Sequence, residues 1–155
     1  MSKEEQIGAI GQQLRLLQQS FDTFDETAAA HLGLNRTDMR CLDILLGRGP
    51  SAAGELSAAL RLSPAATTTV IDRLVRAGFA TRAQDPDNRR RVLVTATDAA
   101  RAVDAELFLP VAEAGGQALT RYDEASLALI LDFLQTAFDV HQEQTRLLAE
   151  RSSGD

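Results

Sequence analysis

The chain has 155 residues, of which 45% are hydrophobic and 25% charged, with a formal net charge of -6 and one cysteine. This length and composition fit one globular domain with a helical extension and exclude a disordered chain. The cysteine count excludes an internal disulfide framework, and the sequence shows neither a membrane-spanning apolar run nor a secretory signal pattern, so we expect a cytoplasmic protein.

The charge is distributed unevenly. Residues 61–101 carry eight arginines against four acids, a net charge of +4, whereas residues 102–155 have a net charge of -7. A basic patch on an acidic body binds phosphates while the rest of the body repels them, which favours one docking orientation on DNA. The middle of the chain is therefore the candidate nucleic-acid-binding region.

The N-terminal segment predicts a long amphipathic helix. Apolar residues recur at helical spacing over residues 4–31, and Gly33 is the expected stop. Asn35 or Thr37 is the expected N-cap of a second helix, which ends at the turn over residues 47–50.

Two further helices are predicted in close succession. Ser51 is the expected N-cap of a short helix that ends near residue 61. Ser63 and Pro64 suit the start of the next helix, and Gly78 suits its end. Two helices joined by such a tight connection predict a helix-turn-helix.

The outward face of the helix over residues 63–77 has the composition of a groove-reading surface. The three consecutive threonines at 67–69 are poor helix formers, so they would lower helix stability without benefit on a surface that binds nothing. Their hydroxyls and methyls, however, suit contacts with phosphates and bases. The alternative is an ordinary exposed helix. The predicted DNA-binding residues of this helix are Ser63, Ala65, Thr68, Thr69 and Arg73.

A two-stranded ribbon is predicted to follow directly. Two β-prone stretches, FATRA and VLVTAT, flank the charged turn QDPDNRRR, in which Arg89, Arg90 and Arg91 form the strongest local charge. Arginine suits the minor groove, so we predict that these three residues bind DNA, with a solvated basic loop as the alternative. Asp85, Asp87 and Asn88 are expected to shape the turn and orient the arginines.

The C-terminal third predicts two more helices. Thr97 or Asp98 caps the first, which is expected to run to Ala114 with a kink at Pro110 and to loosen or end at residues 115–116. The last helix covers about residues 123–150. The apolar faces of the first and last helices exceed what the central unit needs, which favours burial in a two-fold dimer.

Residues 62–97 carry a specific resemblance. SPAATTTVIDRLVRAGFATR followed by DPDNRRRVLVTAT resembles the MarR family of bacterial transcriptional regulators, and the helix order extends the likeness over nearly the whole chain. The resemblance implies a homodimeric winged helix-turn-helix repressor that binds a palindromic operator and is released by a small ligand. It also implies that residues 63–77 form the recognition helix and residues 82–95 the wing. The family places an Asp two residues before the minor-groove arginine, where this chain has Asn88, so Arg90 is the expected tip residue and Asp87 a substitute partner.

Three further predictions concern ligands, the cysteine and catalytic groups. The resemblance implies a ligand pocket between the dimerisation helices and the DNA-binding lobe, for which the candidates are Phe21, Phe24, His31, Met39, Arg40 and Phe108. Cys41 lies in an apolar stretch and is more easily interpreted as core than as a redox sensor. His31 and His141 lack companions at metal-ligand spacing, and no catalytic motif is present, so we expect no metal, no cofactor and no enzyme activity.

The expected fold is mostly α, a winged helix-turn-helix with a two-stranded wing and N- and C-terminal dimerisation helices. The expected regions are a dimerisation helix over residues 1–34, a DNA-binding lobe over 35–100 and dimerisation helices over 101–155. The expected function is a DNA-binding transcriptional regulator that acts as a homodimer on double-stranded DNA. The alternatives are a winged-helix protein-interaction module, because fold alone does not fix function, and a DNA-binding oxidative sensor based on Cys41.

Overall fold

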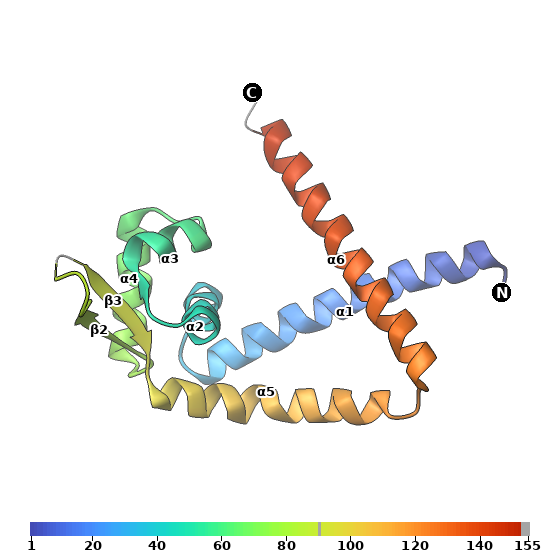
Figure 1. Ribbon diagram of the computed structural model, residues 1–155, viewed down its shortest axis with the longest axis horizontal. Helices are drawn as coiled ribbons and strands as arrows, with labels where there is room; N and C mark the ends of the chain where they lie inside the picture. Colours follow the sequence, from blue (N-terminus) through green and yellow to red (C-terminus); the bar gives the residue numbers. More distant parts are fainter. Residues whose placement is uncertain (90, 153–155) are drawn as a thin grey trace. The chain divides into compact units, whose positions relative to one another are not determined.

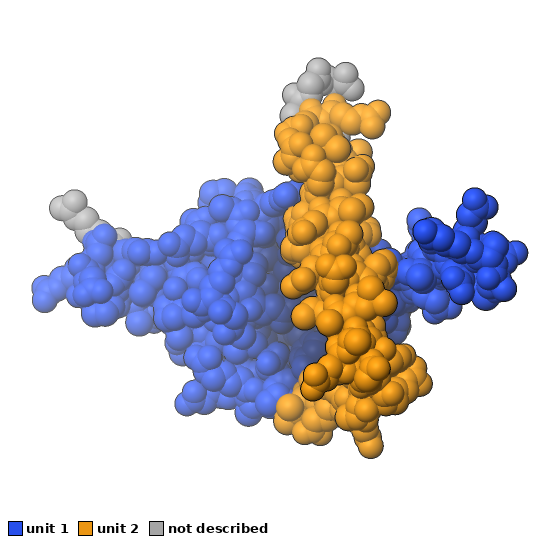
Figure 2. Space-filling view, turned by 45° about the vertical axis from the view of Figure 1, so that its right-hand side comes forward, with its two compact units in different colours: residues 1–108 blue, residues 109–155 orange. Residues whose placement is uncertain are grey.

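The computed structural model describes residues 1–89 and 91–152. Contacts divide the chain into two compact units, residues 1–108 and 109–155 (Figure 2). Within the described residues, no helix combines the length and apolar character needed to cross a membrane. The elements in chain order are α1 (Lys3–His31), α2 (Arg36–Arg48), β1 (Ser51–Ala52), α3 (Ala53–Leu60), α4 (Pro64–Arg76), β2 (Ala80–Gln84), β3 (Val92–Ala96), α5 (Asp98–Leu119) and α6 (Glu124–Ser152) (Figure 1).

The apolar core lies in residues 36–100, which we call the winged-helix lobe. Val70, Ile71 and Leu74 share one face of α4 because of their helical spacing, and all three are buried as that spacing predicts. They pack with residues of α2, α3, β3 and the start of α5. The buried members of this core are Cys41, Leu42, Leu45, Leu56, Leu60, Val70, Ile71, Leu74, Ala80, Val94, Ala96 and Ala100.

The ends of α2 and α4 follow the predicted caps. Asn35 is the N-cap of α2: its side chain accepts a hydrogen bond from the Asp38 amide, and the Asp38 carboxylate accepts one from the Asn35 amide. Ser63 caps α4 by accepting from the Ala66 amide, with Pro64 at the first helical position. These side chains satisfy backbone donors that have no partner within the helix.

The predicted cap of α3 was wrong. Ser51 lies in strand β1, is buried, and donates its hydroxyl to the Gly49 carbonyl. Ala52 is the N-cap position, and Glu55 accepts a hydrogen bond from the Ala52 amide at 2.7 Å. The acidic half of a capping box therefore starts α3 without a hydroxyl partner.

The sheet has three strands in the order β1-β3-β2, all antiparallel. The pairs Ala80↔Ala96 to Gln84↔Val92 form the predicted two-stranded wing, and Ser51↔Val94 adds the third strand. The sequence did not indicate β1, because a two-residue strand is too short to show a periodicity. The predicted fold class is otherwise confirmed, with helices accounting for most of the chain.

Helix α5 is longer than predicted. It continues through Pro110 and through Gly115–Gly116 to Leu119, so the predicted end at Ala114 was wrong. A glycine within a helix costs only about 1 kcal/mol relative to alanine, which is too little to end a helix that other contacts support. Helix α6 begins and ends within two residues of its predicted limits.

Helices α1, α2 and α5 meet in a second apolar cluster within residues 1–108. Ala28 and Ala29 of α1 and Met39 of α2 are buried there. Phe24 of α1 packs against Phe108 of α5, with ring centroids 5.4 Å apart and an interplanar angle of 66°. Edge-to-face pairs of this kind stabilise a contact beyond the area they bury.

Candidate nucleic-acid interface

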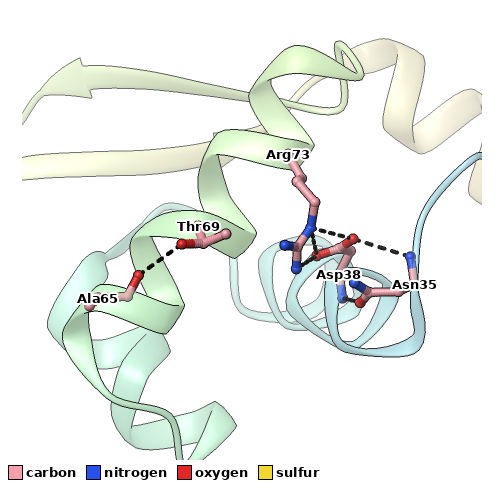
Figure 3. A network of polar contacts seen from close by, with 5 residues as sticks. All are labelled: Asn35, Asp38, Ala65, Thr69 and Arg73. Atoms are coloured by element: carbon pink, nitrogen blue, oxygen red, sulfur yellow. Dashed lines mark hydrogen bonds and ion pairs between the residues drawn. The ribbon is translucent and has the colours of Figure 1, made fainter.

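The exposed face of α4 carries the predicted groove residues. Ala65, Thr68 and Thr69 are all exposed. The Thr68 hydroxyl donates to the Pro64 carbonyl at 3.0 Å. The Thr69 hydroxyl donates to the Ala65 carbonyl at 3.1 Å (Figure 3). Because the hydroxyl hydrogens are used within the helix, the outward groups are methyls and acceptor lone pairs. Threonine methyls fit the C5-methyl group of thymine in the major groove.

The third threonine has a different role. Thr67 is completely buried, its hydroxyl donates to the Ser63 carbonyl at 3.0 Å, and it accepts from the Ser57 hydroxyl at 2.8 Å. The interpretation of all three threonines as groove residues was therefore wrong for Thr67. This side chain shares the inward face with Val70 and Ile71, and it links α3 to α4.

Arg73 of α4 is bound to a buried carboxylate. Its Nε lies 2.9 Å from both Asp38 oxygens, and its Nη2 lies 2.7 Å from Oδ1, while Asp38 is only 1% exposed (Figure 3). This hydrogen bonding raises the pKa of Arg73 further above its ordinary value. Asp38 also caps α2 through Asn35, so one carboxylate ties the start of α2 to the last turn of α4. The structure thus gives Arg73 an internal partner rather than a free guanidinium.

The sequence analysis missed Asp38 as the partner of Arg73. An acid three residues after an asparagine cap is a visible capping signal, but a contact between residues 35 positions apart has no local signature. A second ion pair joins α4 to the wing: Arg82 Nη1 of β2 lies 2.6 Å from Asp72 Oδ1.

The wing turn is built around a buried acid. Asp85 is 8% exposed, and its carboxylate accepts a hydrogen bond from the Asp87 amide at 2.9 Å. The Asp85 amide donates to the Arg91 carbonyl at 2.8 Å, and the Asn88 amide donates to the Asp85 carbonyl at 3.2 Å. Asp85 thus fixes the turn from inside, while Asp87 and Asn88 are exposed.

The three wing arginines differ in their surroundings. Arg89 is exposed at the tip, and Arg90 lies outside the described residues. Arg91 is half-buried directly before β3, where its Nη2 lies 2.5 Å from Glu55 Oε1 and its Nη1 lies 3.8 Å from Asp85 Oδ2. Accordingly, Arg89 presents its charge outward, whereas the charge of Arg91 is paired with two acids of the same chain.

One arginine that the sequence analysis did not single out lies at the connection of α3 and α4. Arg61 has φ 55° and ψ 44°, the left-handed conformation, and its side chain is exposed. A non-glycine residue in this conformation costs about 1 kcal/mol or more. The tight turn between the two helices requires this geometry, and a glycine at residue 61 would have revealed it in the sequence.

Within one chain, the structure brings together some of the six predicted pocket residues. Phe24, Met39 and Phe108 pack against one another in the second cluster, whereas Phe21 and His31 are exposed. Met39 and Arg40 line a small hollow of about 140 Å³ between α1 and α2, together with Asp25, Arg36 and Asp43. Burial raises the pKa of Asp43 to about 6, and the neighbouring charges of Asp25 and Asp104 raise it as well.

Cys41 lies in the main core with no exposed surface. Burial raises the pKa of its thiol to about 11, and the nearby Asp38 contributes to the increase. Because the thiolate is the reactive form of cysteine, this environment disfavours oxidation chemistry in the native fold.

Comparison with known proteins gives consistent results. A sequence model described as the MarR family matches residues 34–92. The chain is 37% identical over 127 residues to YcgE of Bacillus subtilis, an HTH-type transcriptional regulator, and the match covers 82% of each chain. A MarR family protein from Bacillus stearothermophilus has a similar structure, with a TM-score of 0.67 and 19% identity over 94% of this chain and 99% of that one. The apo form of MarR from E. coli gives a TM-score of 0.60 with 21% identity over 82% and 94% of the two chains.

Proposed function

Because the chain belongs to the MarR family of DNA-binding transcriptional regulators, we propose that it acts as a homodimeric repressor on a pseudo-palindromic operator and is released by a small ligand. The observation that carries the DNA contact is the exposed face of α4, where Thr68 and Thr69 present methyl groups and acceptors beside the wing. In this proposal α4 enters the major groove and the wing arginines Arg89 and Arg90 reach the minor groove.

Exposed apolar residues on the outer helices support the homodimer. Phe21 of α1 and Phe138 of α6 are 57% and 61% exposed, and neither helix is polar enough on that face to remain in water without cost. A second copy of the chain is the occupant that a two-fold DNA reader requires. The exposed large apolar residues of these helices are Ile7, Ile10, Leu16, Leu17 and Phe21 in α1, Leu109, Val111 and Leu119 in α5, and Leu129, Leu131, Phe133, Leu134, Phe138, Val140, Leu147 and Leu148 in α6.

We propose residues 1–34 and 101–155 as the dimerisation regions and residues 35–100 as the DNA-binding lobe. Two-fold symmetry then places two recognition helices about one turn of DNA apart, roughly 34 Å. In this proposal the ligand binds more tightly to dimers in which the two α4 helices are not spaced to fit DNA. It weakens DNA binding by no more than the ratio of its affinities for the two dimer conformations. The cluster of Phe24, Met39 and Phe108 lies where α1 and α5 meet the lobe, which makes it a suitable site for such an effect.

The two alternative functions receive less support. A protein-interaction module needs large apolar or aromatic side chains on the outward face of α4, where this chain has the small residues Ala65, Thr68 and Thr69. An oxidative sensor needs a reactive thiolate, whereas Cys41 is buried and its pKa is raised to about 11.

The test is selection of duplexes from a random DNA pool, followed by fluorescence anisotropy on the selected and scrambled duplexes at several salt concentrations. We expect one enriched palindromic sequence, bound by a dimer, with an affinity that falls steeply as salt increases. An Arg89→Ala variant is expected to lose affinity and to show a smaller salt dependence. If no sequence is enriched and selected and scrambled duplexes bind equally, the proposal is wrong.

A matched pair of variants tests the role of Thr68. Thr68→Val keeps the outward methyl and removes the hydroxyl, whereas Thr68→Ser keeps the hydroxyl and removes the methyl. Because the hydroxyl hydrogen is used within α4, we expect the valine variant to keep the sequence preference and the serine variant to lose about tenfold for thymine-containing sites. The reverse order would show that the hydroxyl is the group that reads DNA.

A further inference from the structure

Arg91 has the surroundings of a structural residue. Its guanidinium is shared between Glu55 Oε1 at 2.5 Å and Asp85 Oδ2 at 3.8 Å, so it binds an acid of α3 and the buried acid of the wing turn. Its amide donates to the Asn88 carbonyl, and its carbonyl accepts from the Asp85 amide. Both the backbone and the side chain of Arg91 therefore hold the wing turn.

Glu55 has matching links on the side of the helix-turn-helix. Its Oε2 accepts the Ala52 amide at 2.7 Å while its Oε1 accepts Arg91, and these two hydrogen bonds lower the pKa of Glu55. Ala52 itself pairs with Leu93 of β3. The carboxylate therefore lies where β1, α3 and the turn end of the wing meet.

We propose that Glu55 and Arg91 form a clamp that sets the position of the wing relative to α3 and α4, so that Glu55, although acidic, supports DNA binding. Arg91 is then a positioning residue and not a phosphate contact. This inference rests on the proposed function only for its DNA readout, because the clamp itself is a contact within the chain. The sheet pairing of β1 with β3 holds the middle of the wing, and the clamp holds its turn end.

The charge of Glu55 makes the proposal testable. If Glu55 had no positioning role, removing a negative charge beside a DNA-binding surface would strengthen binding, because phosphates are repelled by carboxylates. The clamp predicts the opposite sign. Glu55→Gln is suitable because glutamine still accepts the Ala52 amide in a capping box but no longer pairs with a guanidinium.

The experiment compares wild type, Glu55→Gln, Arg91→Ala and the double variant on the selected duplex. Asp98→Asn serves as a control, because Asp98 is a fully exposed acid at the start of α5. We expect each single variant to lose about fivefold in affinity, the double variant to lose no more than either single one, and the salt dependence to stay unchanged. Asp98→Asn is expected to bind as wild type or slightly more tightly.

Three results of the binding experiment would overturn the clamp: tighter binding by Glu55→Gln, losses that multiply in the double variant, or an Arg91→Ala salt slope reduced by about 0.9, the value for one phosphate contact. Hydrogen exchange separates failure of the clamp from failure of the proposed function. Without any DNA, both single variants are expected to accelerate exchange of the Asp85 and Arg91 amides, which are hydrogen-bonded in the turn. Faster exchange without selective DNA binding by wild type would keep the clamp and reject the regulator, whereas unchanged exchange would reject the clamp.

Discussion

The winged-helix lobe and helix α6 use apolar residues in opposite ways. Leu56 and Leu74 of the lobe have no exposed surface, whereas Leu129 and Phe138 of α6 are 69% and 61% exposed. Among the residues whose exposure is described, none after Ala100 is buried. The lobe therefore completes its core within one chain, while α6 presents a face that only another surface completes, and we propose that this surface belongs to the partner copy.

The largest expected effect comes from the lobe core. Leu74→Ala removes a fully buried side chain from α4, and we expect the free energy of unfolding to fall by about 3 kcal/mol, because both transfer energy and packing are lost. Urea denaturation followed by circular dichroism measures this loss. It is expected to be the same at low and high protein concentration, since the lobe core needs no partner.

Phe138→Ala is the matched change on α6. At concentrations where the dimer has dissociated, we expect it to change stability by less than about 0.5 kcal/mol, as for other exposed sites. At high concentration it is expected to weaken dimerisation, as measured by analytical ultracentrifugation. Equal losses for Leu74→Ala and Phe138→Ala in the dissociated state would show that α6 is packed within its own chain.

A second prediction concerns a polar part of the lobe. Arg73→Met leaves the buried Asp38 carboxylate without its ion-pair partner, and we expect a loss of about 3 kcal/mol in the free energy of unfolding. Asp38→Asn/Arg73→Met is expected to recover much of this loss, because asparagine is neutral and can still cap α2. Thermal unfolding of both variants gives the comparison. A double variant no more stable than Arg73→Met would show that the loss comes from packing and not from the unpaired charge.

The sequence predicted the local features of the lobe but not its contacts between distant residues. The start of α4 at Ser63–Pro64, its buried face and the two-stranded wing all arise from local rules, namely capping, 3.6-residue periodicity and turn composition. Those rules operate within about ten residues. Contacts between distant residues, such as Arg73 with Asp38 or Arg91 with Glu55, leave no local pattern and appeared only in the structure.

The partners of the predicted site residues were missed for the same reason. The composition of residues 61–101 favoured DNA contacts at Thr68, Thr69, Arg73 and the wing arginines 89–91, because composition counts charges and hydroxyls without their partners. The structure buries Thr67 and pairs Arg73 and Arg91 with acids, which leaves Thr68, Thr69 and Arg89 exposed. A residue type suitable for DNA is therefore a poor guide wherever a carboxylate of the same chain lies within reach.

A third prediction concerns the junction of the lobe with α1 and α5. Asp43 of α2 has a pKa of about 6, raised by burial and by Asp25 of α1 and Asp104 of α5. Since the unfolded chain binds this proton only below about pH 4, the native state binds more protons between pH 4 and 6, and stability falls as pH rises through that range.

Asp43→Asn removes this dependence. The Asp43 side chain is still exposed to water, which screens the effect, so we expect the variant to be about 1 kcal/mol more stable than wild type at pH 7 and equally stable near pH 4. Urea denaturation at four pH values between 4 and 7 measures the difference. Glu106→Gln, an exposed acid of α5, serves as a control and is expected to follow wild type. A constant difference between Asp43→Asn and wild type across the range would contradict the assignment.

The smallest expected effect tests whether the left-handed conformation of Arg61 lowers stability but supports DNA binding. Arg61 adopts a left-handed conformation that glycine adopts without strain, so Arg61→Gly is expected to stabilise the fold. Because glycine also increases the entropy of the unfolded chain, which opposes this gain, we expect the free energy of unfolding to rise by only about 0.5 kcal/mol. The same change is expected to weaken DNA binding severalfold and to lower the salt slope, because an exposed arginine at the helix-turn-helix is placed to meet a phosphate. Arg61→Asn separates the two effects, since asparagine tolerates this conformation without the charge. If both variants gain stability and keep full affinity, the left-handed conformation of Arg61 has no function in DNA binding.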